Sequence, residues 1–394
     1  MNQNGTTYPR ELELILCCAR TRISGEARTR IRELLNEQLD WRRFLEAAEN
    51  HGVKALVSRQ LLNEFAEAVP SSWREILRKD FEAHARRNLI LTAELVRVVS
   101  LFESAGIPAI PYKGPALAEW AYGDVALRQF TDLDIAVRQR DIPRAAGLLE
   151  REGYRSEFGA IAATEGERPM MSEYGFRHAA WGLLVELQTE TTLRYFPRRL
   201  DLDDLSTRRK RVGLAGGKVS TFSPEDTLLL LSVHGAKHFW ERLMWVADIA
   251  ELARTENGMD WERAFAAASR MGVRRIVRLA LGAAGRLVDA PLPDAVKREV
   301  ESDAAAGRLA EGICRRYSLS AQMNVPVFER FRFRVRLREN FWQGLRYGMR
   351  LATSPTNPDQ DKVPLRPRLR RLHRVLRPFL LISRYGIRRA KPNE

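Results

Sequence analysis

The spacing of apolar residues divides the chain into a helical part, a part with strands and a second helical part. From residue 11 to about residue 106, apolar residues recur three and four positions apart, which is the period of an amphipathic helix. The pattern changes at Ile107, where short runs of period two predict a mixed sheet with helices packed on it. Helical periodicity returns after Ser223 and continues to Tyr317. We therefore expect an α+β fold in which a mixed sheet is flanked by helical regions.

Local signals place individual elements within these parts. Ser223 is followed by Pro224 and two acidic residues, which is a typical helix start. We divide the chain into residues 1–106 (helical), 107–221 (sheet core), 222–329 (helical) and 330–394 (a basic, partly helical tail). The sheet core is expected to hold strands at 107–112, 132–137, 154–158, 176–181 and 183–187, and helices at 115–122 and 142–152.

Composition indicates a folded chain in a reducing compartment. Hydrophobic residues make up 45% of the chain and charged residues 29%, which excludes wholesale disorder. Cys17, Cys18 and Cys314 form neither an even-numbered disulfide pattern nor a metal-ligand spacing. The first residues lack the basic start and apolar stretch of a signal peptide, and no window approaches the roughly 18 apolar residues of a membrane-spanning helix. We therefore expect a cytoplasmic protein.

Positive charge is concentrated at the carboxyl end. Residues 330–394 hold 16 Arg and 2 Lys against 4 acidic residues, which gives +14 of the total net charge of +15. Any affinity for polyanions should therefore depend on the tail. Residues 366–389 interleave arginines with apolar residues as a basic amphipathic helix does. Such a helix would either fold over the protein as a cap or contact an anionic membrane surface. Nucleic acid is disfavoured as a partner because the aromatic and glycine pattern of RNA-binding modules is absent.

Two aspartates on one predicted strand are the first candidates for chemistry. Asp132 and Asp134 are two positions apart, so both carboxylates project from one face while the apolar residues beside them project from the other. A divalent cation would relieve the repulsion between these anions, and carboxylate oxygens suit Mg²⁺. Glu186, in the apolar strand at 183–187, is the candidate third carboxylate of a two-metal site. The alternative is that all three are surface acids that face solvent.

The residues upstream of the aspartates suit a phosphate group. Lys113 and Gly114 stand where a predicted strand turns into a helix. Glycine allows close approach of the backbone there, and the unpaired amides at a helix start can bind phosphate. Lys113 and Arg128 would add positive charge. The predicted elements come in the order strand, glycine turn, helix and strand with two aspartates. This is the order in which a triphosphate site precedes its metal ligands.

A third group of polar residues lies after Ser223. Residues 234, 238, 241, 245 and 248 are expected to share one face of a helix, with Lys237 close by. His234 and His238 have a spacing that can bind zinc, but neither a cysteine nor a third histidine lies at a useful distance along the chain. Two interpretations stay open. Either His234, Lys237 or His238 contacts the nucleotide or the acceptor, or this face is structural packing.

Together these motifs resemble an uncharacterised nucleotidyltransferase family of the DNA polymerase β-like superfamily. The resemblance rests on Tyr112-Lys-Gly-Pro-Ala-Leu, Tyr122, Arg128 and Thr131-Asp-Leu-Asp-Ile-Ala-Val. It continues through Val185-Glu-Leu, Ser223-Pro-Glu-Asp, His234-Gly-Ala-Lys-His, Trp245 and Asp248, and into the tail at Ser354-Pro-Thr, Leu376-Arg-Pro and Arg384-Tyr-Gly. Two positions depart from the pattern. Pro115 follows the phosphate-loop glycine and donates no amide, and Gln188 stands where the family often has histidine.

The resemblance implies a polymerase β-like core that transfers a nucleoside monophosphate from an NTP to a hydroxyl or phosphate acceptor and releases pyrophosphate. The three carboxylates would hold two Mg²⁺ ions, while Lys113, Gly114 and Arg128 would orient the triphosphate. The acceptor class stays open between a peptide, a saccharide and a small molecule. An alternative, which Pro115 and Gln188 favour, is a nucleotide-binding module with weak turnover that acts as a partner or maturation factor.

Overall fold

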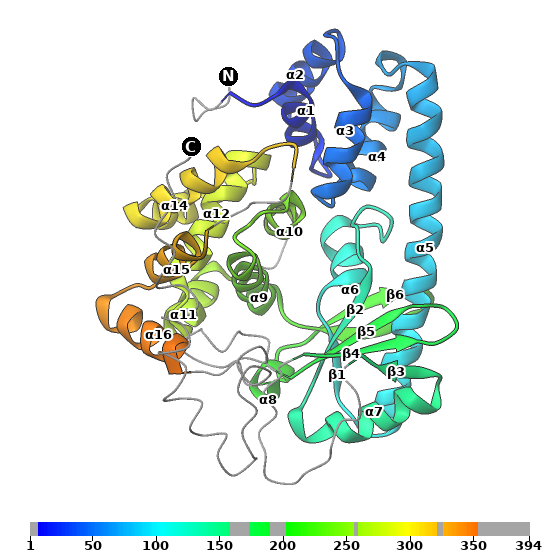
Figure 1. The fold of residues 1–394 in the computed structure, drawn as a ribbon, viewed down its shortest axis with the longest axis vertical. Coiled ribbons are helices and arrows are strands. Elements are labelled where there is room, and N and C mark those ends of the chain that lie inside the picture. Colours follow the sequence, from blue (N-terminus) through cyan, green and yellow to red (C-terminus); the bar gives the residue numbers. More distant parts are fainter. Residues whose placement is uncertain (1–6, 158–172, 190–201, 256–258, 321–325, 354–394) are drawn as a thin grey trace, which may run out of the picture.

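A mixed sheet between two sets of helices forms the fold. The computed structural model describes residues 7–157, 173–189, 202–255, 259–320 and 326–353. Figure 1 shows the N-terminal helices at the top, the sheet at the lower right and the C-terminal helices on the left. One long helix, α5 (Ser71–Ser104), runs from the N-terminal helices down along the sheet. The α+β fold with a mixed sheet is thus as predicted.

The central sheet has five strands in the order β1-β2-β5-β4-β3. β2 and β5 run parallel, and the other neighbours run antiparallel. The strand predicted at 176–181 begins earlier and ends at His178, because the chain turns before Gly182, whose φ of +67° favours glycine. The end of the strand predicted at 154–158 lies outside the described residues. The strands are β1 (Ala109–Pro111), β2 (Asp132–Val137), β3 (Tyr154–Ser156), β4 (Glu173–His178) and β5 (Leu184–Gln188).

One face of the sheet is covered by α5 and α7 (Ile142–Arg151). Leu133, Ile135 and Val137 of β2 point to this face, as their period of two predicts, and all three are fully buried. Val185 and Leu187 of β5 join the same apolar cluster. Burial of such side chains contributes about 1.5–3 kcal/mol each to folding. The aspartates between them must therefore project from the opposite face.

The opposite face carries a small apolar cluster and lies under α9 (Pro224–Lys237). Ile110 and Ala136 of the sheet pack there with Leu230 of α9. This helix begins as predicted, because the side-chain oxygen of Ser223 accepts a hydrogen bond from the Asp226 amide at 3.2 Å. The cap fixes the direction in which α9 crosses the face that holds the aspartates.

A hairpin next to β1 was missed by the sequence analysis. It consists of β6 (Lys210–Leu214) and β7 (Gly217–Thr221), and it turns at Ala215 and Gly216, both of which have positive φ. A two-residue turn with positive φ at both positions matches the twist of the two strands that it joins, and it favours glycine. The sequence does contain a signal for this hairpin. Apolar residues alternate with other residues on both sides of the consecutive glycines at 216 and 217.

The longer helices that remain, apart from α16, share one apolar cluster that joins the beginning of the chain to its later part. The N-terminal helices are α1 (Arg10–Cys18), α2 (Gly25–Leu35), α3 (Trp41–Asn50) and α4 (Lys54–Glu64). The C-terminal helices are α10 (Leu243–Arg254), α11 (Trp261–Met271), α12 (Arg274–Val288), α13 (Asp294–Glu301), α14 (Ala304–Arg316), α15 (Val327–Arg336) and α16 (Phe341–Thr353). Short helical segments lie at Ala66–Ala68, Gln139–Asp141 and α8 (Leu202–Ser206).

The tail is described only in part. α15 and α16 make up its described portion and agree with a partly helical tail. The amphipathic segment at 366–389 and the motifs at Ser354, Leu376 and Arg384 lie outside the described residues. Within the described ranges, none of the helices is both long enough and apolar enough to cross a membrane.

Candidate active site

The predicted carboxylates meet on the face of the sheet that α9 covers. β2 and β5 pair in parallel, with Asp134 directly opposite Glu186. Directly paired residues point to the same face, and so do residues two apart on one strand. Asp132, Asp134 and Glu186 therefore share one face on neighbouring strands. A fourth acid, Glu173 of β4, pairs with Gln188 and lies on this face as well.

Asp134 is the buried centre of the group. Its Oδ1 atom accepts a hydrogen bond from Lys113 Nζ at 3.1 Å and another from Gln188 Nε2 at 2.5 Å. The hydroxyl of Tyr112 donates in turn to Gln188 Oε1. Asp134 is only 6% exposed and Lys113 only 8%. The lysine that the sequence assigned to phosphate is thus held beside the second aspartate, and Gln188 positions the same carboxylate.

Two acids on this face, Asp134 and Glu186, have a raised pKa. Burial raises the pKa of Glu186 to about 7, and the negative charges of Asp134, Asp132 and Glu173 act in the same direction. Burial also raises the pKa of Asp134, which the Lys113 ammonium opposes and the Asp132 carboxylate reinforces. Buried anions that repel one another favour a bound cation. The electrostatics of this face therefore suit a positively charged ligand.

The residue types fit Mg²⁺, which prefers oxygen ligands. Three carboxylates on two neighbouring strands supply those oxygens. As the side chains stand, however, the described part of the chain has no group of three or more His, Cys, Asp or Glu residues that could hold a metal ion. The Oδ1 atom of Asp134 accepts hydrogen bonds from Lys113 and Gln188 instead. An ion at this site would have to share Asp134 with Lys113.

Gly114 stands at the predicted junction between strand and helix. Its φ of +53° lies in the left-handed region, so the backbone conformation itself favours glycine there. The helix predicted at 115–122 forms in two parts, α6 (Gly114–Leu117) and a π-helical turn, Ala118–Tyr122. Pro115 occupies the first turn of α6 and offers no amide. Fewer backbone donors are therefore available to a phosphate than the pattern of the superfamily would give.

Arg128 is bound to Asp248 of α10. Its Nε atom donates to Asp248 Oδ1 at 2.7 Å and its Nη2 atom to Oδ2 at 2.9 Å, while the Tyr122 hydroxyl donates to Oδ1 at 2.7 Å. Arg128 is 4% exposed and Asp248 is fully buried. The guanidinium still lowers the pKa of Asp134 and so acts on the site through its charge. Asp248, for which the sequence suggested no partner, connects the C-terminal helices to the loop that precedes β2.

α9 brings part of the predicted histidine group to the same face. Lys237 Nζ donates to Glu173 Oε1 at 2.9 Å, and the His234 and His238 ring centres lie 4.8 Å apart. Burial lowers the pKa of His238 to about 4, and Lys237 acts in the same direction. Burial also lowers the pKa of His234, helped by the Lys113 ammonium. Both histidines are therefore neutral at pH 7.

The single helical face expected from residue 234 to residue 248 is wrong. α9 ends at Lys237 and α10 begins at Leu243. Between them Phe239 and Trp240 have positive φ, and the Trp240 ring packs so closely on Gly235 that a Cβ there would lie 2.6 Å from it. The tight packing of Trp240 on a glycine reverses the chain, so tertiary contacts override the helical periodicity.

Comparison with known families identifies the family of the chain. A family model described as "Uncharacterised nucleotidyltransferase" matches residues 37–289, which is more than half of the chain and includes every candidate site residue named above. The chain therefore belongs to this uncharacterised nucleotidyltransferase family, and membership supports a general role in nucleotidyl transfer. Neither the curated proteins nor the solved structures contain a match to the chain.

Proposed function

We propose that this protein transfers a nucleoside monophosphate from an NTP to an acceptor hydroxyl or phosphate. An acceptor oxygen attacks the α-phosphorus, the bond from that phosphorus to the β-bridging oxygen breaks, and pyrophosphate leaves. The observation that carries the proposal is the pairing of Asp134 with Glu186 on adjacent parallel strands, beside Asp132. Carboxylates gathered in this way are the ligand set of a two-metal site for in-line displacement.

Asp132, Asp134 and Glu186 would hold two Mg²⁺ ions, which when bound neutralise charge on the triphosphate and on the leaving pyrophosphate. When the acceptor is a hydroxyl, one of these carboxylates takes up its proton.

The basic residues around the carboxylates would bind and orient the triphosphate. The Lys113 ammonium stands 3.1 Å from Asp134, and Lys113 directly precedes the glycine turn at Gly114. Arg128, fixed by Asp248, adds positive potential, and direct contact with phosphate would require it to leave that partner. Positioning and charge neutralisation of this kind supply much of the catalysis in phosphoryl chemistry.

The acceptor would approach from the side of α9. Lys237 reaches Glu173 on the carboxylate face, and His234 and His238 lie beside it. Because both imidazoles are neutral at pH 7, they would contact nucleotide or acceptor through hydrogen bonds or ring stacking rather than through charge. A peptide, a saccharide and a small molecule all remain suitable acceptors.

A second candidate function is a nucleotide-binding module with weak turnover that acts as a partner or maturation factor. It is favoured by the state of Asp134, whose Oδ1 atom is held by Lys113 and Gln188. Pro115 adds to this by removing an amide from the first turn of α6. A module of this kind would bind an NTP beside Lys113 without releasing pyrophosphate.

The test is release of pyrophosphate from each of the four NTPs, with Mg²⁺ and with fractionated cell extract as the source of acceptor. We expect one NTP to release pyrophosphate in a chelator-sensitive way and to leave its α-phosphate on an acceptor. A matched preparation of the Asp134→Asn variant should be inactive, while Glu262→Gln, an exposed acid on α11, should retain full activity. Tight NTP binding by calorimetry without release in any fraction would support the module instead.

A further inference from the structure

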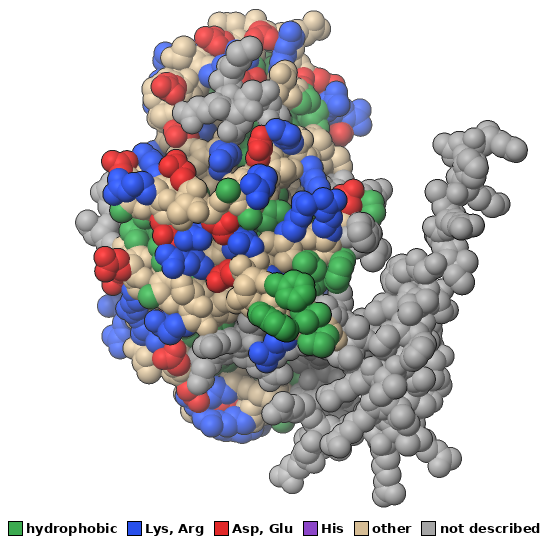
Figure 2. All heavy atoms as spheres, turned by 90° about the vertical axis from the view of Figure 1, so that its left-hand side faces the viewer, with side chains coloured by type: hydrophobic (Ala, Val, Ile, Leu, Met, Phe, Trp, Pro, Cys, Tyr) green, Lys and Arg blue, Asp and Glu red, His purple; other side chains and the backbone are tan. Residues whose placement is uncertain are grey.

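An apolar surface lies on α16, beyond the residues that match the family. Phe341, Leu345 and Met349 are four apart and form one stripe, and their exposed fractions are 75%, 42% and 55%. Trp342 is 74% exposed, and its ring centre lies 5.7 Å from that of Phe341. Figure 2 shows apolar side chains gathered together on one face of the molecule. We call Phe341, Trp342, Leu345 and Met349 the α16 patch.

The patch borders a groove between α15 and α16. Phe331 and Val335 of α15 face the α16 stripe across this hollow, whose volume is about 720 Å³. Contiguous apolar surface on a folded protein usually marks a contact with another molecule or a membrane. The exposed side chains of Phe341, Trp342 and Leu345 are therefore the part of the patch that an occupant would cover.

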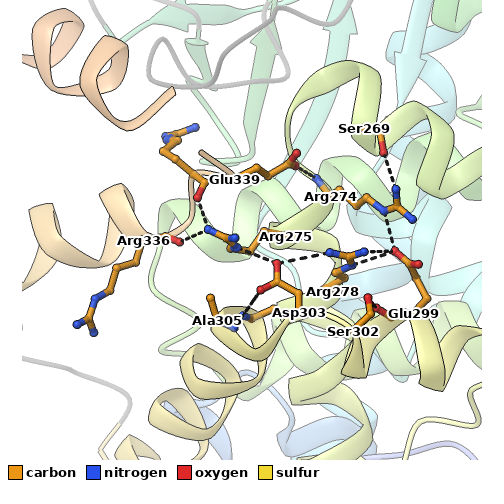
Figure 3. A network of polar contacts seen from close by, with 12 residues as sticks. Ser269, Arg274, Arg275, Arg278, Glu299, Ser302, Asp303, Ala305, Arg336 and Glu339 are labelled. Carbon is orange, nitrogen blue, oxygen red and sulfur yellow. Dashed lines mark hydrogen bonds and ion pairs between the residues drawn. The ribbon is translucent and has the colours of Figure 1, made fainter. Parts of the chain in front are cut away.

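The connection between α15 and α16 is fixed to the body of the protein. Arg275 of α12 donates to the carbonyl oxygens of Arg336, at 3.2 Å, and Arg338, and pairs with Asp303 at 2.8 Å. Glu339 accepts a hydrogen bond from the Arg274 amide at 2.7 Å. Figure 3 shows how these contacts tie the connection to the helices beneath it. The patch is thus held in place before anything binds to it.

The two helices that border the groove also carry exposed arginines. Arg332 and Arg336 on α15 and Arg346 on α16 are exposed, and no acidic side chain in the described residues pairs with any of the three. The nearby acids are already engaged, since Glu339 binds the Arg274 amide and Glu329 pairs with Arg316 at 3.5 Å. Exposed aromatic residues on helices that also carry exposed arginines suit an occupant that offers both an apolar layer and negative charge.

The charge distribution decides between occupants. The remaining tail, residues 354–394, holds 9 Arg and 2 Lys against 3 acidic residues, so the arginines around the patch would repel it. A second copy of the chain would bring the same arginines against each other. An anionic bilayer satisfies both features, because aromatic rings favour the headgroup region and arginines are attracted to acidic headgroups. We propose that the α16 patch is a membrane-contacting surface that places Phe341 and Trp342 in the headgroup region of an anionic bilayer.

The proposal extends the role of the basic tail. α16 ends at Thr353, so the net +8 of residues 354–394 follows directly after the patch. Apolar insertion at the patch and electrostatic attraction along the tail are two separate signals, and two signals give firmer membrane attachment than one. The surface lies outside the family-matched residues, so its failure in a test would leave the proposed nucleotidyl transfer unaffected.

The test measures binding of the full-length protein to sedimented vesicles of equal parts phosphatidylglycerol and phosphatidylcholine. We expect the Phe341→Ser/Trp342→Ser variant to lose about 10-fold or more in partition coefficient, because it removes the apolar insertion. The Arg332→Gln/Arg336→Gln/Arg346→Gln variant should lose a similar factor and show a weaker dependence on salt. Vesicles of phosphatidylcholine alone should bind the unmodified protein about 10-fold more weakly.

Two controls match the size and exposure of the substituted side chains. Leu89→Ser/Ile90→Ser changes apolar residues of α5 that are 56% and 61% exposed, and Trp181→Ala changes a tryptophan that is 64% exposed. Both controls should bind vesicles as the unmodified protein does. Unchanged binding by the two patch variants would overturn the proposal, and so would an equal loss in the controls. A dimer by sedimentation velocity that the Phe341→Ser/Trp342→Ser variant converts to monomer would also overturn it, by assigning the patch to self-association.

Discussion

The two faces of the central sheet use the same strands in opposite ways. Leu133 and Asp134 are neighbours in β2, and both are buried. Leu133 packs among apolar side chains of α5 and α7, whereas Asp134 is surrounded by Lys113, Gln188 and other acids. The apolar face gains stability from contact alone. The polar face holds charges whose repulsion opposes folding, which is a common property of functional sites.

Loss of a carboxylate from the polar face should have the largest effect on activity. We expect Asp134→Asn to lower nucleotidyl transfer by about 10³-fold, because the charge that holds cation and triphosphate is removed. The melting temperature in metal-free buffer should change little, since the loss of one of several clustered anions relieves repulsion and Lys113 keeps the Glu186 carboxylate nearby. Steady-state kinetics and thermal unfolding of the same preparation check both expectations. Full activity in this variant would remove Asp134 from the site.

The Asp248→Asn variant tests whether the polar face depends on the helices behind it. Arg128 would keep its place but lose the opposite charge within a buried pair. Breaking one partner of a buried pair typically costs about 3–5 kcal/mol. Urea unfolding should reveal a loss of this size, with lower activity in the molecules that remain folded. An unfolding free energy within error of the unmodified protein would show that the pair does not anchor the loop before β2.

The Leu133→Ala variant is the matched change on the apolar face, one residue from both aspartates. Removing a fully buried leucine should lower the free energy of unfolding by about 2–5 kcal/mol, because it leaves a cavity against α5 and α7. Activity per folded molecule should fall far less than in Asp134→Asn. If the two variants instead lost activity equally, the faces would not be as separate as their packing indicates.

The smallest expected effect concerns Glu186 and pH. Its pKa is raised from 4.5 to about 7 in the folded protein, so the folded state binds more protons than the unfolded state between these values. The metal-free protein should therefore lose stability as pH rises from 5 to 8 through this group. Glu186→Gln removes that dependence and should gain about 1–2 kcal/mol relative to the unmodified protein at pH 8, after allowance for solvent screening. At pH 5 the two proteins should differ little.

The difference in stability between the unmodified protein and Glu186→Gln separates the contribution of Glu186 from that of other titrating groups. His238, with a pKa lowered to about 4, acts in the opposite direction, because its protonation destabilises the folded state as pH falls. Both proteins contain it, so its contribution cancels. A stability difference that did not change between pH 5 and pH 8 would contradict the assignment of the raised pKa to Glu186.

Local patterns predicted the faces of the sheet, and long-range contacts determined the rest of the site. The period of two in β2 placed Asp132 and Asp134 on one face, and the sequence around Ser223 predicted the start of α9. The pairing of Asp134 with Glu186 depends on the register of strands 52 positions apart, which no local pattern encodes. Arg128 likewise meets an aspartate 120 positions away.

Residues that lie beside the site without a motif were missed for the same reason. Glu173 joins the carboxylates only because β4 pairs with β5, and nothing in its own neighbourhood marks it as functional. The break between α9 and α10 was missed because Trp240 folds back onto Gly235, while the helical periodicity runs on through both segments. In each case a tertiary contact overrode or completed what the local sequence indicated.

α5 is long enough to contribute residues to both large apolar clusters, and this links their unfolding. Its 34 residues extend about 51 Å. Leu77, near its start, belongs to the cluster of the terminal helices, while Leu91 and Phe102 belong to the cluster beneath the sheet. We therefore expect that opening either cluster weakens the other, so that the two unfold as one cooperative unit. Nucleotide bound at the sheet should accordingly slow amide hydrogen exchange not only in β2 and β5 but also in α1–α4, at the far end of the molecule.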